Sequence, residues 1–298
     1  MQKKAMIKGY VLVIVSAILF GCMPLITRYI YAENISRESV VLLRNFLALP
    51  VLGLLTWHQS KSFRVPVKAL PAISIIALMG CCVTPLLLYG SYQYIATGTA
   101  TVFHFIYPAV VVLIGLIFLR KRLNAGTIVA VVLCVIGICL FYDPAKPLNW
   151  TGCALALISG VTYAVYVVLL SAFRYKEVSG FKLSFYISAV CAGVMLLVCL
   201  ITGKLTIPTT LTGWLLSILL AIVINVGAVV MFQRGTFLIG GERSSILSTF
   251  EPLTGVIVGF LALGEDFYPG SGFGSALVII ACILLAVADS KKKSPAAQ

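Results

Sequence analysis

The sequence predicts an all-α integral membrane protein, with ten transmembrane helices arranged as two inverted-topology five-helix repeats. Three observations lead to this fold class. First, 61% of the 298 residues are hydrophobic, 10% are charged, and the mean hydropathy is +1.09. Second, apolar runs of about 20 residues, the length that crosses a bilayer, recur along the chain. Third, the first half of the chain aligns with the second half.

The apolar runs define ten expected spans joined by mostly short connections, so no soluble domain is expected. The spans cover residues 7–28, 39–57, 69–91, 97–118, 125–142, 150–170, 182–201, 212–232, 243–263 and 271–288. The first run follows Lys3, Lys4 and Lys8 and so imitates a signal peptide, but its match to the second half indicates a retained first helix.

The net charge of +13 at pH 7 is distributed unevenly between the expected connections. With a cytoplasmic N-terminus, the outer side would hold few basic residues, namely Arg28, Arg37, Lys146 and Lys204. Arg44 falls inside the second span, and all other Lys and Arg residues fall on the cytoplasmic side. The positive-inside rule therefore predicts that both termini are cytoplasmic. The charge reflects topology and does not indicate a nucleic-acid partner.

Two repeats become visible when Pro108 is aligned with Pro252. Gly126 then falls on Gly270, Leu119 on Leu263, Ala100 on Ser244 and Thr101 on Ser245, and a nearly equal offset aligns Gly9 with Gly152 and Ser16 with Ser159. The repeats are expected over 1–143 and 149–289, followed by a basic cytoplasmic tail over 290–298. Because each repeat has an odd number of helices, the second enters the membrane from the opposite side, as in many secondary transporters.

On these features the chain resembles the EamA family of the drug/metabolite transporter superfamily over essentially its whole length. The motifs are Ser16-x-x-x-Phe20-Gly21, repeated as Ser159-x-x-x-Tyr163-Ala164, then Arg44-Asn45-Phe46-Leu47-Ala48, and Glu251-Pro252 followed by Gly264-Glu265. Lys121 departs from the family pattern, which often has glutamate there, and a cytoplasmic position accounts for the basic residue. The resemblance implies an inner-membrane carrier that exports small metabolites, including amino acids.

Glu251 is the strongest candidate for a functional residue. It lies in the middle of the 243–263 span, about 12 Å from either end by helical rise, so its side chain does not reach the headgroups. A charge at the bilayer centre costs at least roughly 2.5–3.5 kcal/mol, so such residues face the interior and carry function. We expect Glu251 to bind a proton or to neutralise a substrate ammonium group, because desolvation favours the neutral carboxyl form.

His104, Tyr107 and Ser248 are candidates because of the repeat alignment, which pairs His104 with Ser248 and Tyr107 with Glu251. A spacing of three places each neighbouring pair on one helix face. Pro108 and Pro252 remove the donors for the carbonyls one turn earlier and predict kinks beside these side chains. The alternative is structural: His104 would bridge two helices, and Tyr107 would be a core residue.

Phe20, Tyr163 and Arg44 complete the candidate substrate or proton site. Phe20 and Tyr163 are equivalent in the repeat alignment and form either cavity walls or the aromatic core. Arg44 lies roughly 8 Å inside the outer end of its expected helix, so it either binds substrate or snorkels to the outer headgroups.

Motifs of other function classes are missing from the sequence. The nine cysteines lie in apolar runs without a C-x-x-C pair, and with only two histidines no zinc site of ordinary spacing can form. No P-loop, H-E-x-x-H or G-x-S-x-G motif occurs. We expect a secondary transporter of an amino acid, amine or related metabolite in a lipid membrane, with protons as the candidate coupling ion and no cofactor. An integral-membrane enzyme or a sensor is the alternative.

Overall fold

The protein is described by a computed structural model covering residues 2–95, 97–117, 125–140, 149–173, 175, 178–263, 270, 272–274, 276–277, 279–281 and 283–284. Every regular element within these ranges is a helix. Lys121, the Gly264-Glu265 motif and the basic tail at 290–298 lie outside the described residues.

The helices are numbered along the chain, and short segments of other helical type are labelled η. They are α1 (Gln2–Gly21), α2 (Met23–Ala32), α3 (Arg37–Phe46), α4 (Leu49–Ser60), η1 (Val67–Ala69), α5 (Leu70–Ala77), η2 (Leu78–Val83), α6 (Thr84–Ser91), α7 (Thr97–His104), α8 (Tyr107–Ile117), α9 (Ala125–Cys139), α10 (Trp150–Ala172), α11 (Gly180–Thr202), α12 (Leu211–Leu220), η3 (Ala221–Val229), α13 (Val230–Ile239), α14 (Gly241–Leu247) and α15 (Phe250–Leu263).

Six continuous helical stretches are long and apolar enough to cross a membrane. They are Lys4–Ala32, Arg37–Ser60, Val67–Ser91, Trp150–Ala172, Gly180–Thr202 and Leu211–Ile239. They correspond to the first, second, third, sixth, seventh and eighth expected spans, and the eighth extends seven residues beyond its expected end at 232. The chain is therefore a multi-pass membrane protein.

The other expected spans are shorter or interrupted in the structure. Tyr107–Ile117, Ala125–Gly137 and Gly272–Ala281 are apolar helices of 10–17 residues, the last running over residues outside the described set. The fourth and ninth expected spans are each divided in two, α7 from α8 and α14 from α15. The count of ten spans therefore stays a prediction.

Both divisions lie just before a proline, where the sequence predicts kinks. Residues 105–106 separate α7 from α8, and Pro108 is the second residue of α8. Residues 248–249 separate α14 from α15, and Pro252 is the third residue of α15. A proline lacks the N–H that would continue the helical hydrogen-bond ladder and its ring clashes with the preceding turn. The two interruptions occupy equivalent positions in the repeat alignment.

A π-helical segment distorts the third helix of each half. The segments are η2, which starts at Leu78, and η3, which starts at Ala221. These two start positions are equivalent in the repeat alignment at the offset that aligns Gly9 with Gly152, although no sequence pattern predicts either segment. π-helical turns are rare and are frequent at functional sites.

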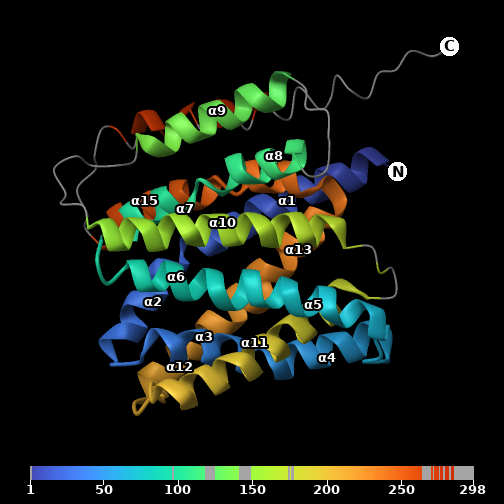
Figure 1. The fold of residues 1–298 in the computed structure, drawn as a ribbon, viewed down its shortest axis with the longest axis vertical. Helices are drawn as coiled ribbons and strands as arrows, with labels where there is room; N and C mark the ends of the chain where they lie inside the picture. Colours follow the sequence, from blue (N-terminus) through green and yellow to red (C-terminus); the bar gives the residue numbers. More distant parts are fainter. Residues whose placement is uncertain are drawn as a thin grey trace.

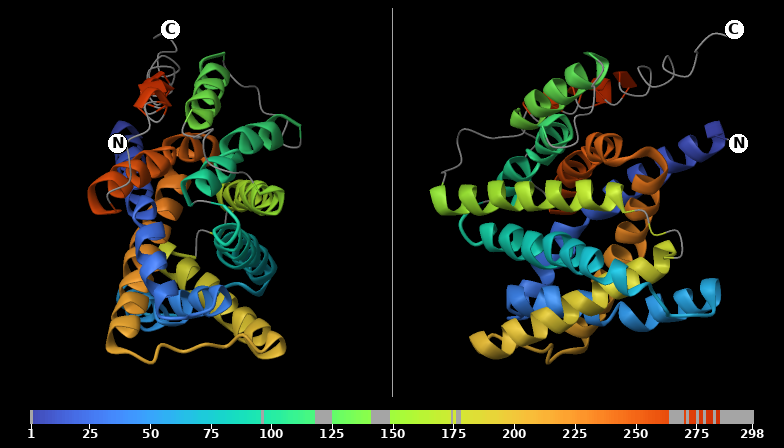
Figure 2. Two further views of the ribbon diagram at one scale, coloured as in Figure 1. Left: turned by 90° about the vertical axis from the view of Figure 1, so that its left-hand side faces the viewer. Right: turned by 45° about the vertical axis from the view of Figure 1, so that its right-hand side comes forward.

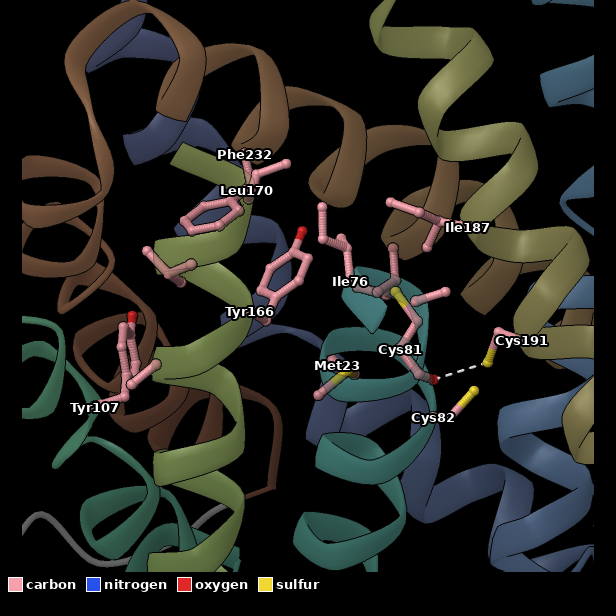
Figure 3. Close-up of a cluster of buried hydrophobic side chains, with 14 of the residues drawn as sticks. Met23, Ile76, Cys81, Cys82, Tyr107, Tyr166, Leu170, Ile187, Cys191 and Phe232 are labelled. Atoms are coloured by element: carbon pink, nitrogen blue, oxygen red, sulfur yellow. Dashed lines mark hydrogen bonds between the residues drawn. The ribbon is translucent and has the colours of Figure 1, made fainter. Parts of the chain in front are cut away.

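Side chains stabilise the irregular backbone of η2. The Thr84 hydroxyl donates to the Met79 carbonyl at 2.6 Å. Pro85 has no N–H to offer the Cys81 carbonyl one turn earlier, and the Cys191 thiol on α11 donates to that carbonyl at 3.0 Å (Figure 3). The distortion is therefore satisfied by one side chain of the same helical stretch and by a thiol from α11.

The helices lie side by side, with most axes running roughly across the view of Figure 1. Figure 2 shows α10 and α6 on one side of the molecule and α1, α13 and α15 on the other. Helix α1 contacts α13 and α15, whereas α10 contacts α6, α7 and α8. The first helix of each proposed half thus packs against broken or distorted helices of the other half.

The two ends of the bundle differ in the groups that they carry. The N-terminus, the connection at 61–68 and the junction of α13 and α14 lie at one end, on the right of Figure 1. There Lys182 Nζ donates to the Arg64 carbonyl at 3.2 Å. At the opposite end Glu38 pairs with Arg37 at 3.0 Å and with Lys204 at 3.3 Å. The basic groups expected in the cytoplasm thus gather at one end, while the sidedness itself stays a prediction.

Candidate functional site

A cavity of about 50 Å³ lies in the middle of the bundle. Its lining residues come from both halves of the chain: Phe20, Met23, Arg44, Gly80, Cys81, Thr84, Pro85, Leu88, Tyr89, His104, Tyr163, Tyr166, Val229 and Glu251. Five of the seven sequence-predicted site residues therefore meet around one cavity. Tyr107 and Ser248 do not line it, and both are buried beside it.

Glu251 is the second residue of α15 and follows the interruption at 248–249. Its backbone N–H donates to the Ser248 carbonyl at 2.9 Å, but its carboxylate has no hydrogen bond or ion pair among the described residues. The interruption gives the carboxylate a helix N-terminus, whose partial positive charge favours an anion. The break therefore offsets part of the cost of placing this charge in a membrane.

The groups that interact electrostatically with Glu251 are tyrosines. The charge of its carboxylate acts on the hydroxyls of three tyrosines, namely Tyr92, Tyr107 and Tyr163. Arg44 lines the same cavity, yet the two side chains form no ion pair within 4.0 Å. Glu251 is thus a carboxylate on a cavity surface without a counter-ion in the described part of the chain.

His104 is the last residue of α7 and is 4% exposed. Its Nδ1 lies 2.8 Å from the Ser159 hydroxyl on α10, and that hydroxyl donates to the Ala156 carbonyl at 2.6 Å. Because a serine has one hydrogen to donate, Nδ1 must carry the hydrogen in the His104–Ser159 bond, which leaves Nε2 as the acceptor in the neutral ring. His104 therefore both bridges two helices, as the structural alternative predicts, and lines the cavity.

Tyr107 begins α8 and is completely buried. Its ring packs edge-on against Tyr163 with centroids 4.8 Å apart. Its hydroxyl makes no hydrogen bond of normal geometry, and it faces Ser248, whose own hydroxyl donates to the Ser244 carbonyl at 2.8 Å. Tyr107 and Ser248 thus bring the two helix interruptions together behind the cavity, and Figure 3 shows Tyr107 beside α10.

Aromatic rings form one wall of the cavity. Tyr163 on α10 contacts His104 at 5.4 Å, Tyr166 at 5.3 Å and Phe232 at 6.0 Å between ring centroids. Phe20, from the first helix, also lines the cavity and is half-buried. The repeat-related pair Phe20 and Tyr163 therefore occupies the cavity wall, although Tyr163 belongs equally to the aromatic core.

Arg44 points into the protein and does not snorkel to the headgroups. It lies on α3, is 3% exposed, and its Nη1 donates to the Tyr89 hydroxyl at 2.9 Å. The Tyr89 hydroxyl in turn donates to Met23 Sδ at 3.1 Å. The snorkelling alternative is therefore wrong, because Tyr89 and Met23 hold the guanidinium inside the bundle.

Met23, Cys81 and Thr84 line the cavity without having been singled out as site residues. Apolar or weakly polar residues in apolar spans carry no sequence signal that separates a cavity wall from a core. The dipeptide Thr84-Pro85 was the available hint, because a proline inside an apolar run implies a local distortion.

Comparison with known proteins places the chain among membrane transporters. Relatives include YicL of Salmonella typhimurium, named an uncharacterized inner membrane transporter, with 24% identity over 97% of this chain and 98% of that protein. An uncharacterized transporter of Archaeoglobus fulgidus is 27% identical over 93% and 95%. YwfM of Bacillus subtilis, also named an uncharacterized transporter, is 24% identical over 79% of each chain.

A solved crystal structure has the same fold. It superposes with a TM-score of 0.71 over 98% of this chain and 99% of that chain, at 15% sequence identity. The EamA-like transporter family model matches residues 7–142 and again residues 150–287, which together cover nearly the whole chain. The chain therefore belongs to the EamA-like transporter family.

Proposed function

We propose that this protein is an alternating-access secondary transporter that exports an amino acid, an amine or a related small metabolite across the inner membrane. The observation that carries the proposal is the Glu251 carboxylate, which lies on a cavity lined by both halves and has no partner among the described residues. A charge left unpaired inside a membrane bundle is costly, and its usual reason is binding of an ion or substrate. Family membership favours transport over catalysis.

Glu251 would act by alternating between two partners. The ionised carboxylate holds a substrate ammonium group, and protonation neutralises the carboxylate and releases the cation. Substrate and proton then compete for one group, which is the simplest form of proton-coupled exchange. The nearby side chains are polar but uncharged, namely those of Tyr92, Tyr107 and Tyr163. They therefore do not take the place of the proton or of the substrate ammonium group.

Alternating access requires elements that bend, and the cavity is bounded by such elements. The interruptions at 105–106 and 248–249 place His104 and Glu251 at helix ends. The π-helical segments η2 and η3 contribute Gly80, Cys81 and Val229 to the lining. Short stretches of irregular helix at a midplane site are typical of transporters.

Two inverted repeats over 1–143 and 149–289, with ten spans in all, are part of the proposal. The matching interruptions and the matching π-helical segments support it, as do the two separate stretches that the family model matches. A repeat with an odd number of helices would place the connections at 61–68 and 143–149 on opposite sides of the membrane.

Reporter fusions would test this topology. A reporter inserted within 61–68 or fused after residue 293 should give a cytoplasmic signal, and a reporter within 143–149 should give an external one. An external C-terminus would contradict both the even number of spans and the inverted repeat.

The test of the function is transport by Glu251→Gln in proteoliposomes. The glutamine keeps the shape of the side chain and removes its charge, so we expect uptake or efflux to lose its dependence on pH between about 5.5 and 8, or to stop, without loss of folded protein. The transported solute should leave the vesicle chemically unchanged, which separates transport from catalysis.

The matched control is Glu33→Gln. Glu33 caps the end of α2, accepts a hydrogen bond from Thr210 and does not line the cavity. This variant removes the same charge at the end of the bundle and should transport at the parental rate. If Glu251→Gln also transports at the parental rate across the same pH range, the proposed role of Glu251 is wrong.

A further inference from the structure

Arg44 carries a buried positive charge for which the described residues provide no acidic partner. It is 3% exposed, and the ion pairs of the described residues gather at Glu38, not at Arg44. Buried charges are normally paired, because one partner missing from a buried pair leaves a large desolvation cost uncompensated. The guanidinium therefore lacks the anion that its position calls for.

The hydrogen bonds of Arg44 leave its Nε–H without a partner. A guanidinium has five N–H groups in a planar fork. Nη1 donates to the Tyr89 hydroxyl at 2.9 Å and lies 3.8 Å from Met23 Sδ, whereas Nε is buried with no partner. Tyr89, Met23 and Cys81 thus hold the guanidinium, and Nε is the donor that has no partner. A planar fork with free donors is the geometry that binds a carboxylate in two parallel hydrogen bonds.

The unpartnered Nε–H belongs to a residue that lines the central cavity. Arg44 contributes to the cavity from α3 and Glu251 contributes from α15, so opposite charges line one cavity without forming an ion pair. Met23, Cys81 and Tyr89 surround Arg44, and all three are weak or neutral acceptors. An occupant that carries both an anion and a cation would complement this arrangement.

The size of the cavity limits that occupant. Its volume is about 50 Å³, and a single water molecule needs roughly 10–15 Å³ of such space. The space as it stands admits a few waters, so a small cargo enters only when the bending elements move apart. One guanidinium matches one carboxylate, and recognition of a phosphate cargo would be expected to use several cations.

We propose that Arg44 is the carboxylate-binding subsite of the transport cavity, and that the cargo is a small zwitterion whose carboxylate binds Arg44 and whose ammonium group binds Glu251. This inference rests on the proposed function and narrows its substrate class from amino acids, amines and related metabolites to amino acids. Tyr89 is a positioning residue, because its hydroxyl accepts from Arg44 and fixes the plane of the fork.

The test is ligand binding to the purified full-length protein, measured by thermal stabilisation and calorimetry. The common L-amino acids are screened first, and each amino acid that binds is then compared with its amide and with its decarboxylated amine. We expect the loss of the carboxylate to weaken binding about tenfold or more, the range of a charge-assisted hydrogen bond.

Arg44→Lys should weaken binding of the amino acid by about tenfold or more and leave binding of the matching amine unchanged, because a lysine keeps the charge but not the fork. Tyr89→Phe should show the same pattern more weakly, and it serves as the second variant should Arg44→Lys fold poorly. Glu251→Gln should have the opposite selectivity, with weaker binding of the amine.

The inference is overturned if no amino acid stabilises the parental protein, if amides or amines bind as tightly as their acids, or if Arg44→Lys and Tyr89→Phe bind the acid like the parent. Its failure is distinguishable from failure of the proposed function. Transport of an amine that still depends on Glu251 would preserve the function and remove the carboxylate subsite, whereas Arg44-dependent binding without Glu251-dependent transport would do the reverse.

Discussion

The two interrupted helices show how equivalent positions of one architecture acquire different chemistry. At the first interruption, His104 is held by Ser159 at 2.8 Å and is surrounded by the rings of Phe105, Tyr107 and Tyr163. At the second, Glu251 stands at the start of α15 with no hydrogen bond from the described residues to its carboxylate. At the first interruption the His104 ring is satisfied internally, and at the second the Glu251 carboxylate is not.

The two interruptions are equivalent to within one residue in the repeat alignment, but that alignment pairs His104 with Ser248 and Glu251 with Tyr107, so the contrast is between the two interruptions and not between paired residues. A polar group with its partner in place stabilises one arrangement of α7 and α10, whereas an unpaired carboxylate on a cavity is free to bind what enters. Both interruptions also depend on close helix approach. A glycine of the other half faces each one, Gly160 against the His104 carbonyl and Gly21 against the Glu251 carbonyl.

The largest effect on stability should come from filling these glycine contacts. A methyl group at Gly160 would overlap the His104 carbonyl oxygen, and one at Gly21 would overlap the Glu251 carbonyl oxygen and Thr254. Because both obstacles include backbone atoms, Gly160→Ala and Gly21→Ala should each destabilise the protein by about 1–3 kcal/mol. The thermal midpoint of the purified protein measures this.

Gly193 in α11 provides the matched control, because a methyl group there meets no atom within 4 Å. Gly193→Ala should be neutral or stabilise by up to about 1 kcal/mol through helix propensity. Equal thermal midpoints for Gly160→Ala and Gly193→Ala would mean that close approach at the first interruption contributes nothing.

A comparable or smaller effect should distinguish the two interruptions directly. Ser159→Ala leaves the buried Nδ1–H of His104 without its acceptor, so it should cost about 1–3 kcal/mol. Ser248→Ala removes a hydroxyl that donates to the Ser244 carbonyl within its own helical segment, so it should cost less, at most about 1 kcal/mol. The comparison of the two thermal midpoints is the measurement.

These alanine variants also test the assignment of roles. If the His104–Ser159 contact is structural, Ser159→Ala should lower the thermal midpoint and leave the transport rate per folded molecule near the parental value. Should Ser248→Ala prove the more destabilising of the two, the contrast between a satisfied and an unsatisfied interruption would be wrong.

Much of the site was predictable because membrane burial makes polar residues conspicuous. Glu251 and Arg44 are charged residues inside apolar runs, and His104 lies one turn before a proline, so each can be recognised from the sequence alone. The repeat alignment also relates His104 to Ser248 and Tyr107 to Glu251, and in the structure Tyr107 faces Ser248. Residues such as Met23, Cys81 and Thr84 had no such signal, since an apolar wall and an apolar core have the same composition.

The sequence by itself determined the membrane class, the six long helices and the kinks before Pro108 and Pro252, because hydropathy and the missing proline N–H act locally. Only the tertiary structure decided that Arg44 points inward to Tyr89, that His104 is held by Ser159, and that Glu251 remains without a partner among the described residues. Those outcomes depend on which helices of the two halves meet. A side chain's partner across the bundle is a property of packing that no local pattern encodes.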